Sequence, residues 1–466
     1  MLYTGFSRQD MTPNKEVPLG GYGNAEQRLG NLVLHPITVS CTAFRDEDGT
    51  LALLFSQDTC GVAGAHTEAF KRQLQEKLGV KPENVFFHAI HTHEAPEIRL
   101  PIDHPLMTDW YQHKYYPAVL RAAEEAVADL APCEIYAGKD EIFDYNYVRR
   151  YLDPSGKFIT RKEAKSTPGA VHESEPDRDV QVIRFARQGR PDIILVNFQS
   201  HPSGFLDGYS ATNISSDYPH YLRTTVELHE TAHCMFIQGA AGNLVFMGLL
   251  PGDRLYGKMT DKELAMRQYG EGIAQKVLEI LKFKTQKLEP GKIRTVEITD
   301  NFPVNHALDK YVDVAQKIVD LYLADKKDES IELAAKSGLA GDGGSGFYKC
   351  KAILSRAKQP KTKEMISWAM SIGDLGFGFA PNEVFDTNGR FVKDNSPYKM
   401  TFFCELTNDS RGYLPTKLAF SHGGYEVDTC QYSPGVAERM ADNIVKALEA
   451  CKKDKKPAAK RAKKKA

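Results

Sequence analysis

The sequence has no pair of cysteines separated by two residues, the spacing that zinc ribbons and thiol redox motifs use. Several of its eight cysteines stand inside apolar runs, as Cys404 does after two phenylalanines, and such positions are typical of buried thiols. These features exclude the common cysteine-based metal and redox sites and predict a reduced, cytoplasmic protein. The cysteines are Cys41, Cys60, Cys133, Cys234, Cys350, Cys404, Cys430 and Cys451.

Long apolar runs are also missing. No segment approaches the ~20 consecutive apolar residues that a membrane-spanning helix needs. The first ten residues contain no charged stretch followed by an apolar one, as a secretory signal requires. We therefore expect no secretory signal and no stable insertion into a membrane.

The charge is unevenly distributed, although the formal net charge of the 466 residues is only −1. Residues 452–466 carry nine Lys or Arg and one Asp, and they contain no large apolar side chain. A segment of this composition cannot bury enough surface to order itself, so it predicts a disordered basic tail. The tail is either a solubilising appendage or a weak contact for nucleic acid.

Strand and helix patterns alternate through the first 280 residues. Apolar runs at 51–56, 85–90 and 192–198 predict buried strands, and helical periodicity follows at 67–78, 110–130 and 218–231. This alternation predicts an α/β fold with a mixed, mostly parallel sheet flanked by helices. Further helices and a strand predict an additional C-terminal α+β portion, with a helical insertion at about 303–345. We expect a single catalytic domain over 1–451.

Two histidines stand at the end of a predicted strand, in the sequence Ile90-His91-Thr92-His93. In an extended chain, residues two apart point to the same side, so both imidazoles can reach one point in space. Neutral imidazole suits both metal binding and proton transfer. The pattern alone favours neither role.

Other predicted strands also end in polar residues: Asp58 follows the run at 51–56, and His201 follows the run at 192–198. Ligands bind at strand ends in open α/β sheets, so these residues and His91 are candidates for one shared site. Histidines together with a carboxylate form catalytic zinc sites that keep a position open for water. The residues alone do not identify that carboxylate.

Several short segments resemble the catalytic domain of neutral/alkaline non-lysosomal ceramidases, which are zinc-dependent amidases. The segment 91–96 (HTHEAP) is similar to that family's HTHSGP, and 238–243 (QGAAGN) resembles its QGxxG segment. Weaker matches follow the family's order along nearly the whole chain. They are residues 5–13, 20–23, 146–149, 200–202, 216–219, 381–383 and 412–413, and Tyr425.

The resemblance implies a set of site residues. It implies zinc held by His91, His201, Glu383 and Tyr413. It implies catalytic roles around the scissile carbonyl for His93, Arg149 and Tyr425. It also implies that Gly21, Tyr22 and Asn243 contact the substrate.

The chain departs from the family at one functional segment. Where ceramidases carry Gly-Asp-Val-Ser-Pro, this chain has Gly242-Asn243-Leu244-Val245-Phe246. Val245 offers neither the nucleophile nor the hydrogen bond of the family's serine, and Asn243 keeps hydrogen bonding without the charge. We also expect no counterpart of the family's C-terminal immunoglobulin-like domain.

These features predict a zinc-dependent hydrolase of a C–N amide bond in a small or N-acylated substrate, rather than in ceramide. Two alternatives stay open. One is a zinc hydrolase of an ester, a phosphoester or a modified sugar. The other is a non-catalytic family member, which the valine at position 245 favours.

Overall fold

The structure is a computed structural model that describes residues 1–23, 25–203, 212–246, 248–253, 261–341 and 346–453. Its largest sheet has the strand order β16-β14-β13-β8-β1-β5-β6-β7, and β18 pairs with β8. In chain order the strands are β1 (Leu2–Asp10), β5 (Thr38–Arg45), β6 (Leu51–Gln57), β7 (Val85–Ala89), β8 (Ala131–Glu141), β13 (Asp179–Arg187), β14 (Ile193–Phe198), β16 (His233–Gln238) and β18 (Gln286–Leu288).

A second sheet, in the order β19-β20-β21-β23, packs against one face of the first. Side chains that alternate along the strands meet between the sheets, where Leu54 and Leu195 of the first sheet share a core with Met370 and Phe377 of the second. Its strands are β19 (Ile293–Pro303), β20 (Thr362–Ile372), β21 (Leu375–Phe379) and β23 (Met400–Cys404).

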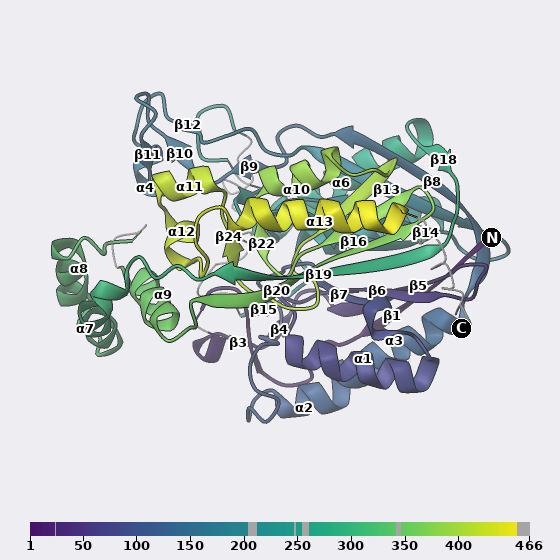
Figure 1. The fold of residues 1–466 in the computed structure, drawn as a ribbon, viewed down its shortest axis with the longest axis horizontal. Helices are drawn as coiled ribbons and strands as arrows, with labels where there is room; N and C mark the ends of the chain where they lie inside the picture. The colour runs from purple at the N-terminus through teal and green to yellow at the C-terminus, as the bar shows by residue number, and fades with distance from the viewer. Residues whose placement is uncertain (24, 204–211, 247, 254–260, 342–345, 454–466) are drawn as a thin grey trace, which may run out of the picture.

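Helices cover both outer faces, so the molecule has four layers in the order helix, sheet, sheet, helix (Figure 1). Two separate cores under helices of the first layer contain Phe55 and Val196, the neighbours in sequence of Leu54 and Leu195. The helices on the first sheet are α1 (Gly64–Leu78), α3 (Tyr116–Ala128), α5 (Tyr218–Glu230) and α6 (Lys262–Phe283). Those on the second sheet are α10 (Asp386–Asp394) and α13 (Val436–Lys452).

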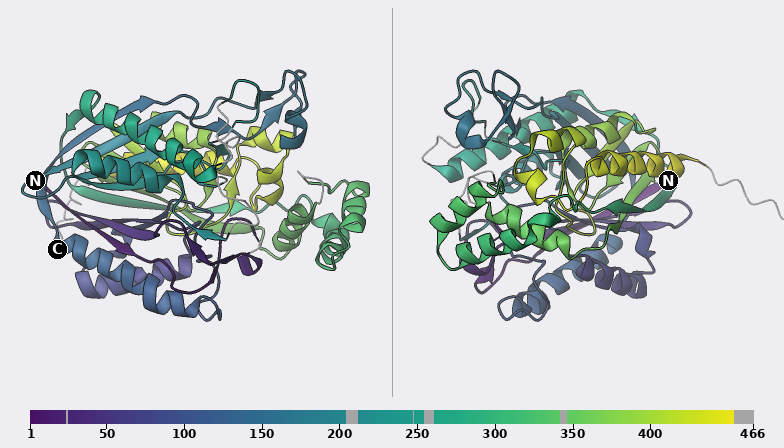
Figure 2. Two further views of the ribbon diagram at one scale, coloured as in Figure 1. Left: turned by 180° about the vertical axis from the view of Figure 1, so that it is seen from behind. Right: turned by 60° about the vertical axis from the view of Figure 1, so that its left-hand side comes forward.

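Three further helices form a lobe that projects from one end of the layers (Figure 2). The helices of this helical lobe are α7 (Val312–Leu323), α8 (Lys327–Lys336) and α9 (Phe347–Ala357), with a short turn η6 (Asp309–Tyr311) before them. They enclose a small core of their own that includes Ile318 and Ile353.

The remaining elements are short strands and short helices in the segments between the long elements. The short strands are β2 (Val17–Pro18), β3 (Leu29–Gly30), β4 (Leu32–Val33), β9 (Tyr147–Val148), β10 (Tyr151–Leu152), β11 (Phe158–Ile159), β12 (Val171–His172), β15 (Asn213–Ile214), β17 (Leu244–Val245), β22 (Glu383–Val384) and β24 (Tyr413–Leu414). The short helices are η1 (Ala25–Gln27), η2 (Pro82–Asn84), α2 (Thr108–Trp110), the π-turn η3 (Tyr111–Tyr115), α4 (Arg161–Ala164), α11 (Lys417–His422) and α12 (Tyr425–Thr429).

The predicted mixed α/β class is confirmed, but the expectation of a mostly parallel sheet is wrong. In the large sheet, β6 with β7 and β14 with β16 are parallel, whereas the other described pairs are antiparallel. Both faces of this sheet are covered, so its strands are continuous apolar runs whatever their direction. The apolar runs therefore did not reveal strand direction.

The predicted basic tail lies mostly outside the described residues, which end at residue 453. In the part of the chain that the structure describes, none of the helices is both long enough and apolar enough to cross a bilayer.

Asp58, which the sequence places at a strand end beside the candidate histidines, belongs to the scaffold instead. Its buried carboxylate accepts two hydrogen bonds from the Arg223 guanidinium, at 2.6 and 2.9 Å, and two more from the backbone and hydroxyl of Thr38. This pairing joins the end of β6 to helix α5. Both partners are almost completely buried, so neither charge can be left alone without a large cost.

We therefore expect Asp58→Asn to lower the free energy of unfolding by about 3 kcal/mol, because it leaves the Arg223 charge buried without a partner. Denaturant unfolding of the purified variant measures this change. Asp109→Asn is the matched control, because Asp109 pairs with Lys15 at an exposed position and such pairs contribute at most about 1 kcal/mol. Equal losses in the two variants would contradict a structural role for the buried pair.

Candidate metal centre

The two edges of the large sheet come together, and this contact brings the predicted site residues to one place. The backbone N–H of Gln238 in β16 donates to Nε2 of His88 in β7, at 2.9 Å. The hydroxyl of Ser56 in β6 donates to the carbonyl of Phe236 in β16, at 2.7 Å. Because β7 continues into His91 and β14, next to β16, leads to His201, the curled sheet places both histidines side by side.

Three potential ligand atoms form a tight triangle there. Nε2 of His91 lies 2.9 Å from Nε2 of His201, and Oε2 of Glu383 lies 3.3 Å and 3.5 Å from these two nitrogens. Ligands of a tetrahedral zinc ion, with bonds of about 2.0–2.1 Å, are separated by about 3.3 Å. The spacing of the triangle therefore fits one small divalent cation.

Both imidazoles are held by backbone carbonyls on their far side. Nδ1 of His91 lies 2.5 Å from the carbonyl of Cys60, and Nδ1 of His201 lies 2.8 Å from the carbonyl of Ala241. A carbonyl only accepts hydrogen bonds, so each Nδ1 carries a proton and each Nε2 is the nitrogen left to bind a metal. This arrangement is typical of metal-binding histidines.

The protonation states agree with ligand roles for His201 and Glu383. Burial, followed by the charges of Arg149 and His91, lowers the pKa of His201 to about 3, so its imidazole stays neutral. Burial on its own raises the pKa of Glu383, but the two neighbouring histidines outweigh it and hold that pKa well below its usual value. Oε2 of this carboxylate is buried and lacks a hydrogen-bond partner. The donor set and this unsatisfied oxygen therefore fit a divalent metal ion.

Tyr413 lies next to this triangle through strand pairing. Strands β22 and β24 are parallel, and Tyr413 stands opposite Glu383 in their register. The Tyr413 hydroxyl accepts a hydrogen bond from Nη2 of Arg149, at 3.2 Å. The predicted fourth ligand thus shares an immediate neighbourhood with Glu383 and Arg149.

His93 stands on another side of the triangle. Its Nε2 lies 3.5 Å from Nε2 of His91, and burial together with the charges of His91 and His201 lowers its pKa well below the usual value. Gly21 makes room for this ring: its φ is +104°, and a Cβ added there would lie 2.4 Å from Cγ of His93. The Tyr22 ring meets His93 edge-on, with 4.8 Å between centroids.

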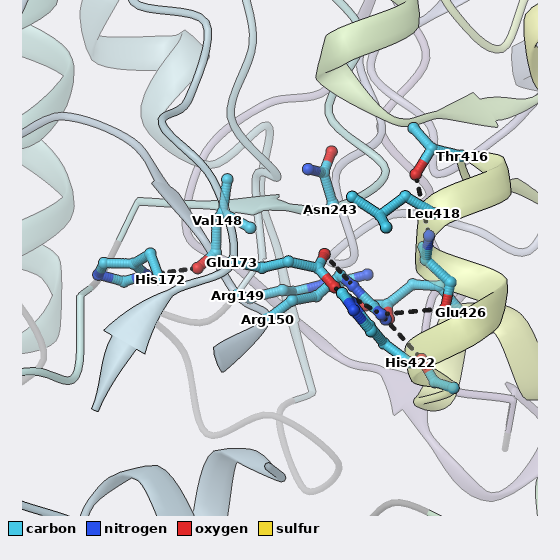
Figure 3. A network of polar contacts seen from close by, with 12 residues as sticks. Val148, Arg149, Arg150, His172, Glu173, Asn243, Thr416, Leu418, His422 and Glu426 are labelled. Atoms are coloured by element: carbon cyan, nitrogen blue, oxygen red, sulfur yellow. Dashed lines mark hydrogen bonds and ion pairs between the residues drawn. The ribbon is translucent and has the colours of Figure 1, made fainter. Parts of the chain in front are cut away.

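Arg149 is held in a network of charged groups that also contains Arg150, Glu173, His422 and Glu426 (Figure 3). Its Nε donates to Glu426, at 2.8 Å, and the second carboxylate oxygen of Glu426 contacts Arg150, at 3.2 Å. Arg150 in turn pairs with both oxygens of Glu173, which also lies 2.6 Å from Nδ1 of His422. Glu426 directly follows the predicted catalytic residue Tyr425, whose ring lies 5.8 Å from that of Tyr413.

Asn243, predicted to contact the substrate, makes a structural contact instead of facing the triangle with a free amide. Its Nδ2 donates to Oδ1 of Asp386, at 2.7 Å, and its Oδ1 accepts from the backbone N–H of Asp386, at 2.9 Å. The side chain is 2% exposed. Val245, which replaces the family's serine, lies in β17 and pairs with Tyr147 of β9.

The sequence reasoning missed two residues beside the triangle. Cys60 brings its Sγ together with ligand atoms of His91 and His93, all within 4.8 Å of one another. Arg28 is almost fully buried, and its Nη2 donates to the carbonyls of His93 and Gly20. Neither residue belongs to a motif, so no sequence signal pointed to it.

Two solved structures share this architecture. Neutral ceramidase from Pseudomonas aeruginosa matches with a TM-score of 0.70 and 17% sequence identity, over 96% of this chain and 74% of that chain. A ceramidase complexed with C2 matches with a TM-score of 0.69 and 18% identity, over 97% and 75%. The chain has the neutral ceramidase fold. No family model matches the sequence, and neither does any curated protein.

The resemblance inferred from short motifs is thus confirmed at the level of the fold. Its motif at 91–96 contains both His91 and His93, and the neutral ceramidase fold brings that motif to Glu383, nearly three hundred positions later. The assignment of individual roles to these residues stays a prediction.

We expect His91→Ala and His201→Ala each to abolish stoichiometric metal binding, because each removes one of three close ligand atoms. Elemental analysis of the purified variants measures bound zinc directly. Thermal unfolding gives a second measurement, since zinc added to the metal-free wild type should raise its midpoint and leave the midpoint of the variants unchanged. His113→Ala, at an exposed position, is the control. Full zinc occupancy in either ligand variant would contradict the assignment.

Proposed function

We propose that this protein is a zinc-dependent hydrolase of amide bonds that acts on a small or N-acylated substrate rather than on ceramide. The triangle of His91, His201 and Glu383 is the observation that carries the proposal. A partly exposed Tyr413 beside Glu383 is the proposed fourth ligand. The neutral ceramidase fold supports the reaction class, because the two similar proteins are described as ceramidases.

His91, His201, Glu383 and Tyr413 would hold a zinc ion, which would serve as a Lewis acid for the substrate carbonyl and would lower the pKa of a water molecule to about 7. His93 accepts the proton of the attacking water at Nε2 and delivers it to the nitrogen of the leaving amine. Its Nε2 lies 3.5 Å from Nε2 of His91, which puts the imidazole beside the proposed metal.

Arg149 and Tyr425 stabilise the negative charge that develops on the carbonyl oxygen. The guanidinium of Arg149 is held in place by Glu426 and by the carbonyl of Gly242, so it needs little reorganisation when charge develops. Preorganised donors of this kind contribute about 3 kcal/mol each to lowering a barrier. Gly21 and Tyr22 shape the position of His93.

The replacement of serine by Val245 supports a substrate other than ceramide. A valine supplies no hydroxyl to a substrate amide, and the neighbouring Asn243 is engaged by Asp386. Hydrolysis therefore depends on the metal triangle and on His93. The eight cysteines are all free and buried, which supports the proposed reducing, cytoplasmic location.

The same ligand set also serves hydrolysis of an ester, a phosphoester or a modified sugar. A non-catalytic protein that keeps the metal is the remaining alternative, and Val245 is the feature that favours it. A panel of N-acyl amides and their matched esters, assayed with the zinc-loaded protein, separates these cases. We expect the protein to hydrolyse amides. Cleavage of esters without cleavage of any amide would contradict the proposed reaction.

We expect His93→Ala to keep stoichiometric zinc while kcat falls by about 10²- to 10⁴-fold, because the proton acceptor is lost and no ligand is removed. Steady-state kinetics on the best amide of the panel and elemental analysis measure both quantities. His113→Ala serves again as the control, with unchanged kcat. An undiminished kcat in His93→Ala would refute the proton-transfer role.

A further inference from the structure

Tyr348 belongs to the helical lobe and contacts two neighbours of the metal triangle, Tyr22 and Tyr425. It is not among the site residues predicted from the sequence. It is the second residue of α9, and its hydroxyl donates to the carbonyl of Tyr22, at 3.1 Å. The Tyr348 ring also lies close to Gly23, where an added Cβ would be 3.1 Å away. The lobe is therefore attached to the glycine-rich turn that holds His93.

On its other side, Tyr348 contacts the proposed catalytic residue Tyr425. The two rings are perpendicular, with 6.1 Å between centroids, and Tyr425 makes a second edge contact with Tyr413, at 5.8 Å. A continuous row of contacts thus connects Tyr22, Tyr348, Tyr425 and Tyr413. We call these four residues the tyrosine wall.

Both ends of the tyrosine wall meet the metal centre. Tyr22 contacts the His93 ring, and Tyr413 stands opposite Glu383. Tyr22, Tyr348 and Tyr413 are partly exposed, and Tyr425 is 38% exposed. They come from four separate segments of the chain.

Partly exposed aromatic rings next to a reaction centre favour a particular kind of ligand. Pairs of aromatic rings in edge-to-face or offset arrangements gain more than their buried area predicts, whereas a long alkyl chain gains only the area term. The ring of Tyr348 lies beside Tyr425, which is proposed to face the scissile carbonyl. A ring close to that carbonyl in the substrate would therefore contact Tyr348.

We propose that Tyr348 determines specificity by packing against an aromatic ring in the acyl group of the substrate. This inference rests on the proposed function, because it assumes an amide substrate. It concerns the binding affinity of that substrate, which can be measured separately from turnover. It assigns a role in substrate selection to the helical lobe.

The experiment compares two amides that carry a flat aromatic ring or a saturated six-membered ring, N-methyl-2-phenylacetamide and N-methyl-2-cyclohexylacetamide, by titration calorimetry with the zinc-loaded protein. We expect about tenfold tighter binding of the phenyl compound by the wild type, and loss of this preference in Tyr348→Ala. Tyr348→Phe should keep most of the preference, because it removes the hydrogen bond to Tyr22 and retains the ring.

Tyr322→Ala is the matched control. Tyr322 lies in the same lobe and stacks on Phe347, with 4.2 Å between centroids, so its removal disturbs the packing of the lobe without removing a member of the tyrosine wall. Thermal unfolding of each variant shows whether it is folded. The control should keep the preference for the phenyl compound.

Equal affinity of the wild type for the two amides, or no detectable binding of either, overturns the inference. The same holds if Tyr348→Phe loses the preference as fully as Tyr348→Ala, because the hydroxyl would then be the deciding group. Preferential binding without turnover leaves the inference standing while the proposed function fails. Turnover of both amides without a preference in binding overturns the inference and leaves the proposed function standing.

Discussion

The site depends on three ligand atoms that lie this close only with a proton or a metal ion between them. With Nδ1 of each histidine bound to a carbonyl, Nε2 of His91 and Nε2 of His201 face each other across 2.9 Å. Burial lowers the pKa of His91, but the neighbouring Cys60 and Glu383 outweigh it and hold that pKa well above its usual value. The ionised carboxylate of Glu383 completes the group. Such a cluster is costly in a buried place, and a metal ion offsets that cost through the attraction it supplies. The scaffold must therefore be rigid enough to hold these groups together before the ion arrives.

That rigidity comes from backbone contacts more than from the site side chains themselves. The contact between β7 and β16 closes the sheet behind the histidines, and Gly242 lets the chain pass close to Glu383, where an added Cβ would lie 2.6 Å from a backbone oxygen. His91 itself has a φ of +70°, a conformation that a non-glycine residue adopts at some cost. Strained backbone conformations of this kind are common at functional sites.

The sequence predicted the local elements better than their arrangement. The helices expected at 67–78 and 218–231 correspond to Gly64–Leu78 and Tyr218–Glu230. The helix expected at 110–130 corresponds to the consecutive helical segments over 108–128. Periodicity records which residues are buried, so it locates such elements well. Strand direction and the curling of the sheet depend on contacts between distant segments, and no local pattern encodes them.

The candidate site shows the same limit. Strand-end histidines indicated His91 and His201, whereas Glu383 and Tyr413 came only from the family resemblance, because a glutamate after Pro-Asn looks like any turn residue. Asp58 was a false candidate for the site, since a strand-end carboxylate can equally well bind a buried arginine. Arg28 and Cys60 carried no signal at all.

The helical lobe has a hydrophobic core separate from those of the two sheets. An insertion that folds around its own core can lengthen, shorten or change its surface while the layers beneath keep their packing. Under the role proposed for Tyr348, substrate selection belongs to this lobe and the metal triangle belongs to the layers beneath it. Descendants of one metal-binding scaffold could thus diverge in what they accept through changes in this appended module alone.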